Sequence, residues 1–213
     1  MANKPAGKVL VGFSHPTIGL YTAVGGVVKY TDGRRLARGV EVSFSINTSD
    51  DNKFYADNQV AESESGKFID GKATLTVDGL HDDADRMISG IPEPVEVSCG
   101  DKKVKVTKYG DSAKPPYLGV GFLLLYQCGG ADIWQPMILT KGKFATHGTD
   151  AKTQEEKRDW QTQKLDVALH RDDSATHDWK WLAEEFSSEA EALAVLDALL
   201  GVSAPAAAGA EEG

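Results

Sequence analysis

The stretch that decides the fold lies between residues 118 and 140 and reads LGVGFLLLYQCGGADIWQPMILT. Two largely apolar segments, Leu118–Cys128 and Ile133–Thr140, flank the dipeptide Gly129-Gly130. Two consecutive glycines supply the positive φ angles that a tight turn between antiparallel strands requires. The opening run, LGVGFLLLY, has about half the length of a membrane-spanning helix. We therefore expect a β-hairpin here and no membrane span.

Alternation of apolar and polar residues extends the β pattern over much of the chain. In VEVSFSI, residues 40–46, every second side chain is apolar, which is typical of a strand with one buried face. The same alternation recurs at 73–77, 104–106 and 165–169. A further turn is expected at Thr31-Asp32-Gly33, between the short apolar stretches Val27–Tyr30 and Leu36-Ala37. These patterns predict a mainly antiparallel β protein.

Two helices are expected among the strands. Apolar residues at spacings of three and four from Leu80 to Ile88 follow one helix face, with acidic residues in the first turn and Gly90 at the end. A second helix is expected from Ser188, at capping-box spacing from Glu191, through an apolar stripe to Gly201. Residues 203–213 consist of Ser, Ala, Pro, Gly and Glu, and we expect this tail to be disordered.

Length and charge limit the classes of function. With 213 residues, 41% of them hydrophobic, the chain can bury a real core. Its net charge of −9 argues against binding nucleic acid or an anionic membrane by bulk attraction. The segment from Asp178 to the C-terminus holds eight acidic residues against one lysine, so most of the negative charge lies there. We divide the chain into a β domain, 1–182, and an acidic helix with its tail, 183–213.

Two long polar segments, 47–66 and 143–159, are expected to be loops. Residues 47–66 contain five acidic residues and one lysine around the apolar pair Phe54-Tyr55. Long loops in small domains are usually functional or disordered. An aromatic pair within a polar loop favours a docking anchor over a flexible excursion.

Several clusters could carry chemistry, but each has a simpler structural explanation. The acids of His81–Asp85 lack the alternating spacing of a calcium loop and are better explained by helix capping than by a metal. Residues 170–178 contain two His and three Asp but resemble a polar turn more than a catalytic site. Gly119-Val120-Gly121 lacks the third glycine, the lysine and the helix of a phosphate loop. Cys99 and Cys128 are isolated in the sequence and are expected to be buried, reduced thiols. We therefore assign no catalytic, cofactor-binding or metal residues and expect no enzyme.

Three tryptophans leave a binding function open. Trp160, Trp179 and Trp181 could stack on sugars, although tryptophans more often pack over the ends of a sheet. One hypothesis is thus a carbohydrate- or surface-binding β-sandwich module. A hydrolase using residues 170–178 is another hypothesis.

Short motifs in a fixed order resemble one family. They are Val11-Gly12, Phe54-Tyr55-Ala56-Asp57-Asn58 with Glu62, Ile88-Ser89-Gly90, Pro116-Tyr117 with Gly121-Phe122, Lys141-Gly142-Lys143-Phe144 and Trp160-Gln161-Thr162-Gln163. Through them the chain resembles the major tail proteins, or tail tube proteins, of long-tailed bacteriophages, in particular the phi13-type group. The likeness covers about residues 9–182, and residues 183–213 do not map onto the family core.

The resemblance implies a β-sandwich or barrel with a flanking helix. It also implies hexameric rings that stack into a hollow tube, through which phage DNA passes transiently without tight binding. The implied partners are further copies of the chain, a tape measure protein inside the tube, a tail terminator and a distal tail protein, with no membrane and no cofactor. The implied location is the virion tail, after synthesis in the cytoplasm of a host bacterium.

The resemblance also gives segment 47–66 a role. This segment would reach an adjacent subunit or ring through the residues Phe54, Tyr55, Ala56, Asp57, Asn58 and Glu62. Its net charge of −4 requires basic surface opposite, for which Arg34, Arg35 and Arg38 are the candidates.

Overall fold

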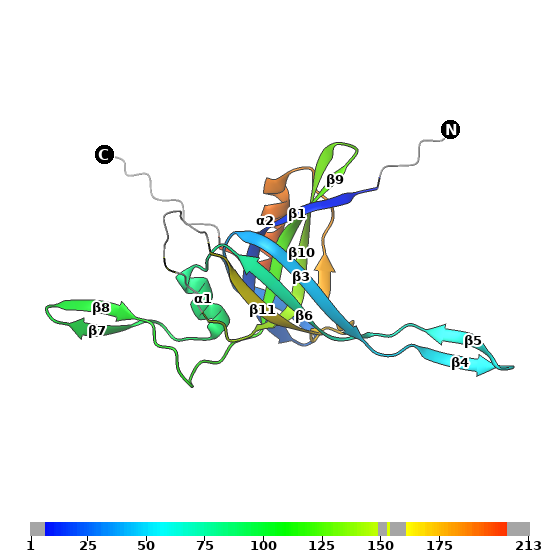
Figure 1. Cartoon of the computed structure of the whole chain (residues 1–213), viewed down its shortest axis with the longest axis horizontal. Coiled ribbons are helices and arrows are strands. Elements are labelled where there is room, and N and C mark those ends of the chain that lie inside the picture. Colours follow the sequence, from blue (N-terminus) through cyan, green and yellow to red (C-terminus); the bar gives the residue numbers. More distant parts are fainter. Residues whose placement is uncertain (1–6, 149–152, 154–160, 204–213) are drawn as a thin grey trace.

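The computed structural model describes residues 7–148, 153 and 161–203. Its elements, in chain order, are β1 (Val9–Val24), β2 (Val27–Arg35), β3 (Gly39–Thr48), β4 (Asn52–Ala56), β5 (Gln59–Glu64), β6 (Phe68–Val77), α1 (Asp82–Ser89), β7 (Val95–Cys99), β8 (Lys102–Val106), β9 (Leu118–Cys128), β10 (Ala131–Phe144), β11 (Gln163–His170), β12 (Lys180–Leu182) and α2 (Glu189–Leu200). The protein is mainly β, with antiparallel sheets and two helices, as its alternating sequence pattern predicts (Figure 1).

One large sheet forms the body. Its strands follow the order β2-β1-β9-β10-β11-β6-β3. The short strand β12 pairs with residues 137–139 of β10, and β11 pairs with residues 141–144 of the same strand. The sheet curves until β3 lies near β1, where the Phe13 ring contacts Gly39 and the rings of Phe44 and Phe122 lie 6.3 Å apart. Within the described part of the chain, no ladder joins β3 to β1 or β2, so the sheet remains open and does not form a closed barrel.

The main core lies inside this curve and is covered by α1. Fully buried side chains from four strands, Leu75, Phe122, Leu139 and Leu165, form its centre. Helix α1 adds Ala84 and Ile88, which are four residues apart and so share one face. The helix ends at Gly90, which adopts the left-handed conformation expected of a C-terminal glycine.

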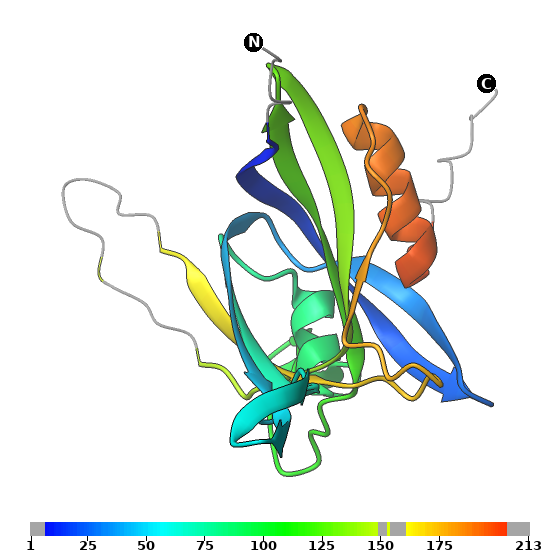
Figure 2. The ribbon, with the colours of Figure 1, turned by 90° about the vertical axis from the view of Figure 1, so that its right-hand side faces the viewer.

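A second apolar cluster holds α2 on the other side of the sheet (Figure 2). The helix begins after Ser188, whose hydroxyl accepts a hydrogen bond from the Glu191 amide, and ends at the left-handed Gly201, as predicted. Its buried residues Leu196 and Leu200 lie over Gly121, where an added Cβ would stand 2.7 and 2.8 Å from their methyl groups. Glycine in β9 thus lets the helix approach the sheet closely, and α2 shares a core with the β domain.

Of the two turns expected from the sequence, one is confirmed and the other is wrong. Gly129 and Gly130 have positive φ and join β9 to β10, so that hairpin is confirmed. The turn between β1 and β2, however, is Gly25-Gly26, while the predicted turn at residues 31–33 lies inside β2. Residues 31–33 resemble a turn in the sequence because they form a β-bulge. The pairing of β1 with β2 shifts register between Ile18 and Leu20, and Asp32 has a positive φ.

Two further expectations change. Residues 47–66 are not a loop, because β4 and β5 pair there as an extension of the β3–β6 pair, and β10 runs into the second polar segment as far as Phe144. Most of 149–159, the expected tail from 204 onward and Trp160 lie outside the described residues. Cys99 is exposed and Cys128 is half-buried, so the expected buried pair is wrong. Neither of the helices described is long and apolar enough to span a membrane.

Candidate functional site

The β4–β5 hairpin carries the six residues expected to make contacts between subunits. Its turn is Asp57-Asn58, and both residues have left-handed φ angles of 51° and 60°, as a type I′ turn requires. At its base the Gly66 amide donates to the Asp51 carboxylate at 3.0 Å, and the Ser49 amide donates to the Lys67 carbonyl at 2.8 Å. The local sequence therefore builds a defined ribbon that projects from the body (Figure 1).

Large apolar side chains lie on the surface of this ribbon. Phe54 is 64% exposed and Tyr55 61% exposed, and Val60, which pairs with Tyr55, is also exposed. Every residue of β4 and β5 is exposed, including Ala56 and Glu62. A cluster of exposed aromatic residues with acidic neighbours is typical of a surface that another protein covers.

The three candidate arginines already have carboxylate partners in their own chain. Arg34 lies 2.7 Å from Asp32, and Arg35 lies 2.7 Å from Asp197 of α2. Arg38 pairs with Asp78, although most of its side chain is exposed. These arginines thus stabilise the connections around β2, and a contact with an acidic hairpin would compete with these pairs.

A second projecting hairpin, β7–β8, escaped the sequence-based assignment. Only residues 104–106 were predicted as a strand, although VEVSC and KKVKV flank Gly100-Asp101 and supply the usual hairpin signal. All ten strand residues are exposed. Near its base, the Tyr109 hydroxyl donates to Asp85 of α1, and this hydrogen bond together with burial raises the pKa of Tyr109 to about 12.

Open strand edges are the other feature of the surface. Strand β3 ends the sheet path, and β1 pairs with β2 only from Thr17 onward. None of the residues that the structure describes therefore pairs with one edge of the first residues of β1. Both open stretches carry exposed apolar side chains, of which Val11 is 58% and Val40 56% exposed. Unpaired edges with apolar side chains are surfaces that a second strand can cover.

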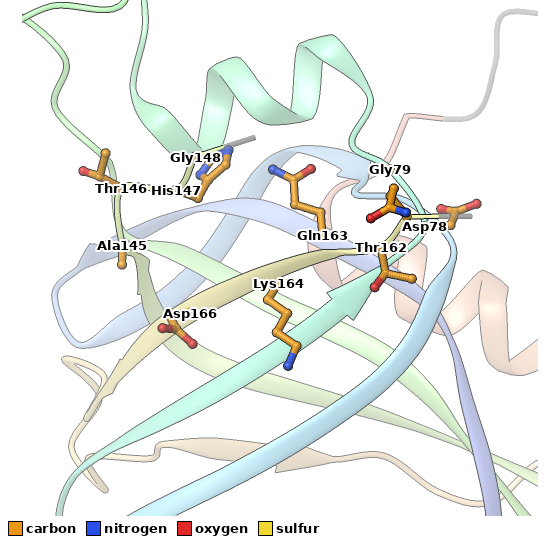
Figure 3. Close-up of a pocket in the computed structure, with 11 residues that line it drawn as sticks. Asp78, Gly79, Ala145, Thr146, His147, Gly148, Thr162, Gln163, Lys164 and Asp166 are labelled. Atoms are coloured by element: carbon orange, nitrogen blue, oxygen red, sulfur yellow. The ribbon is translucent and has the colours of Figure 1, made fainter. Parts of the chain in front are cut away.

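One hollow of about 750 Å³ lies between the end of β10, the start of β11 and the chain after β6 (Figure 3). Its ionisable lining is largely paired, because His147 lies 2.8 Å from Asp85, and Asp166 lies 2.8 Å from Lys72. The Lys72 ammonium and the Thr74 hydroxyl lower the pKa of Asp166 by hydrogen bonding. Two ionisable side chains of the lining are thus held by residues outside it.

The remaining clusters from the sequence have structural roles. Asp172 is buried and accepts hydrogen bonds from the amide and hydroxyl of Ser174, which closes the turn of residues 170–178. Trp179 stacks on Phe68 with ring centroids 4.9 Å apart, and Trp181 packs against Tyr30. Both tryptophans are therefore partly covered by the fold, which leaves less ring surface for a sugar.

The acids of His81–Asp85 lie in the first turn of α1, where the helix dipole favours negative charge. Over the described ranges, no three His, Cys, Asp or Glu side chains are grouped to hold a metal ion. Comparison with known proteins adds no family: no protein-family model matches this sequence, and no curated protein matches it.

Proposed function

We propose that this protein is the structural subunit of the tail tube of a long-tailed bacteriophage. Copies of the chain would form closed rings, six to a ring, and the rings would stack into a hollow conduit for DNA. The resemblance of its ordered motifs to the phi13-type tail proteins supports the proposal. The described surface supports it independently, because it carries open strand edges and exposed apolar side chains.

The observation that carries the proposal is the pair of open, apolar strand edges on one molecule. The edge of β3 and the first residues of β1 are different surfaces, so their pairing joins one copy to the next in a head-to-tail manner. Head-to-tail contacts close into a ring when the rotation between copies divides a full turn. In such a ring the curved sheet of each copy would supply part of a continuous wall of sandwich or barrel type.

A conduit differs from a nucleic-acid-binding protein in its electrostatics. Tight binding to phosphates requires clustered Lys and Arg on the surface that faces the DNA, and we expect the wall of the tube to lack such a cluster. Phage DNA would therefore pass without being held. The tape measure protein would occupy the tube, and the tail terminator and the distal tail protein would bind its two ends.

Lysine substitution at the two edges tests the ring. Val11→Lys and Val40→Lys place a charge where a neighbouring strand would pair, and both side chains are more than half exposed, so the fold should persist. We expect rings and tubes, seen by electron microscopy of concentrated protein, from the wild type and not from these variants. Val24→Lys is the matched control, because Val24 is 81% exposed at the turn between β1 and β2.

Two results would contradict the proposal. One is a wild-type protein that stays monomeric at every concentration, with and without an initiating tail complex. The other, and stronger, comes from the phage that encodes the chain: deleting the gene must leave particles without tails, and tailed particles would refute the assignment.

A further inference from the structure

Two hairpins of opposite chemistry remain uncovered on this molecule. We name β4–β5 (Asn52–Glu64) the acidic hairpin and β7–β8 (Val95–Val106) the lysine hairpin. Each is a separate two-stranded sheet with no third strand on either edge among the described residues. Isolated two-stranded ribbons are marginal in water, because they bury little apolar surface. A surface that covers them would stabilise both.

The lysine hairpin has two distinct faces. Val95 pairs with Val106 and Val97 with Val104, which places four half-exposed valines on one face. Its outer strand β8 carries Lys102, Lys103 and Lys105 among five residues. Within the described part of the chain, the one ion pair of these lysines joins Lys103 to Glu96 at 3.7 Å. Lys103 and Lys105 alternate with the valines, so the ribbon has one apolar face and one face with surplus positive charge.

The acidic hairpin is its complement. Strand β5 carries Glu62 and Glu64 and no basic residue. Glu64 lies 3.3 Å from Lys67, an exposed pair of little strength, and the exposed aromatic side chains of β4 stand beside this strand. Phe54 shares the face of Glu62, and Tyr55 and Val60 lie on the opposite, apolar face. Each hairpin thus has one charged and one apolar face, and the charges of the two hairpins are opposite in sign.

The two hairpins cannot meet within one molecule. They project from opposite ends of its longest axis (Figure 1). A second copy displaced along that axis brings its acidic hairpin to the lysine hairpin of the first. Such a contact uses two different surfaces, so it repeats from copy to copy.

We propose that the lysine hairpin of one subunit docks on the acidic hairpin of the next, with the β8 lysines facing the β5 glutamates. Strand β8 pairs along β5, so the two ribbons complete each other as one intermolecular sheet. On one face of this sheet Lys103 and Lys105 lie beside Glu62 and Glu64, and on the other the valines continue the apolar surface of Tyr55 and Val60. The contact rests on the proposed function only in that the neighbouring copy is another tube subunit.

Charge reversal with complementation tests this contact. Variant A is Lys103→Glu with Lys105→Glu, and variant B is Glu62→Lys with Glu64→Lys. Each variant alone sets like charges against each other, and we expect its self-association, measured by sedimentation, to weaken at least about tenfold. In a 1:1 mixture every contact between A and B joins opposite charges, so association should return.

A second pair of lysines distinguishes this contact from an effect of net charge alone. The matched control is Lys29→Glu with Lys143→Glu, which changes the net charge as variant A does but uses exposed lysines of β2 and β10.

The outcomes separate this inference from the tube itself. Tubes formed equally well by variants A and B would overturn the hairpin contact and leave the proposed function standing. Folded variants whose mixture fails to associate would also overturn it. Association that depends on the hairpin charges but builds no tubes would support the contact and contradict the tube.

Discussion

Truncation of Leu196 tests whether α2 is an integral part of the fold. The side chain has no exposed surface and lies over Gly121 at the centre of the second core. Leu196→Ala removes three carbon atoms, each contributing about 0.8 kcal/mol when buried, and leaves a cavity under the helix. Together the two effects should lower the free energy of unfolding by about 3 kcal/mol. For a chain of this size, that corresponds to a fall in Tm of roughly 6–12 °C.

The measurement is urea unfolding followed by circular dichroism, at protein concentrations low enough to prevent association from contributing. Leu199→Ala is the matched control, because Leu199 lies in the same helix but is 40% exposed. We expect Leu199→Ala to lower the free energy of unfolding by less than about 1.5 kcal/mol. The side chain buries less apolar surface than Leu196, and its removal leaves no closed cavity. Equal losses in the two variants, or a loss below about 1 kcal/mol for Leu196→Ala, would refute the packing of α2 described here.

Three further predictions concern the anchor pair and two ionisable groups. Replacing both Phe54 and Tyr55 with Ala should leave a folded protein, since both are exposed, but should weaken tube formation seen by electron microscopy. The pKa of Asp166 is held below its usual 3.8, so its contribution to stability is complete above pH 3.8 and is lost as the pH falls further. Asp166→Asn should therefore make the free energy of unfolding, measured by urea unfolding, depend less on pH at acidic pH. Burial raises the pKa of Tyr30 above the usual range, so ultraviolet titration should leave one tyrosine un-ionised until the protein unfolds, and Tyr30→Phe should remove that late transition at a cost of about 1 kcal/mol.

Each of these has a result that would contradict it. Normal tubes from the double alanine variant would exclude an anchor role for the aromatic pair. An acid limb that Asp166→Asn leaves unchanged would mean that the pair with Lys72 adds no stability. Complete ionisation of all tyrosines in the folded protein would show that the Tyr30 hydroxyl is accessible.

The regular elements could be predicted because their signals are local. The alternation in 73–77 and 165–169 reports one buried face of a strand, and the glycine after each helix reports its end. The alternation in 40–46 also marks a strand, but the buried face expected there is wrong, because Val40, Phe44 and Ile46 are exposed. The turn at Gly129-Gly130 has the same local character.

The errors arise where a local signal has two structural explanations. Asp32-Gly33 fits a turn and also fits a bulge, and only the partner strand decides between them. The polar composition of 47–66 suggested a loop, although a hairpin that projects into solvent is equally polar on both faces. Partner choice was also out of reach, since nothing in the sequence around Arg35 indicates its pairing with Asp197, 162 positions away.

The openness of the curved sheet has a consequence for how the protein must be produced and stored. An edge such as β3, with apolar side chains and unpaired backbone groups, does not distinguish a correct neighbour from any other extended chain. Specific pairing therefore depends on features beside the edge, and the rate of unspecific clustering rises with concentration and with salt that screens the acidic surface. Low ionic strength should limit this clustering, because the net charge of −9 keeps copies apart. Added salt should promote clustering while it weakens the specific contact between the lysine and acidic hairpins.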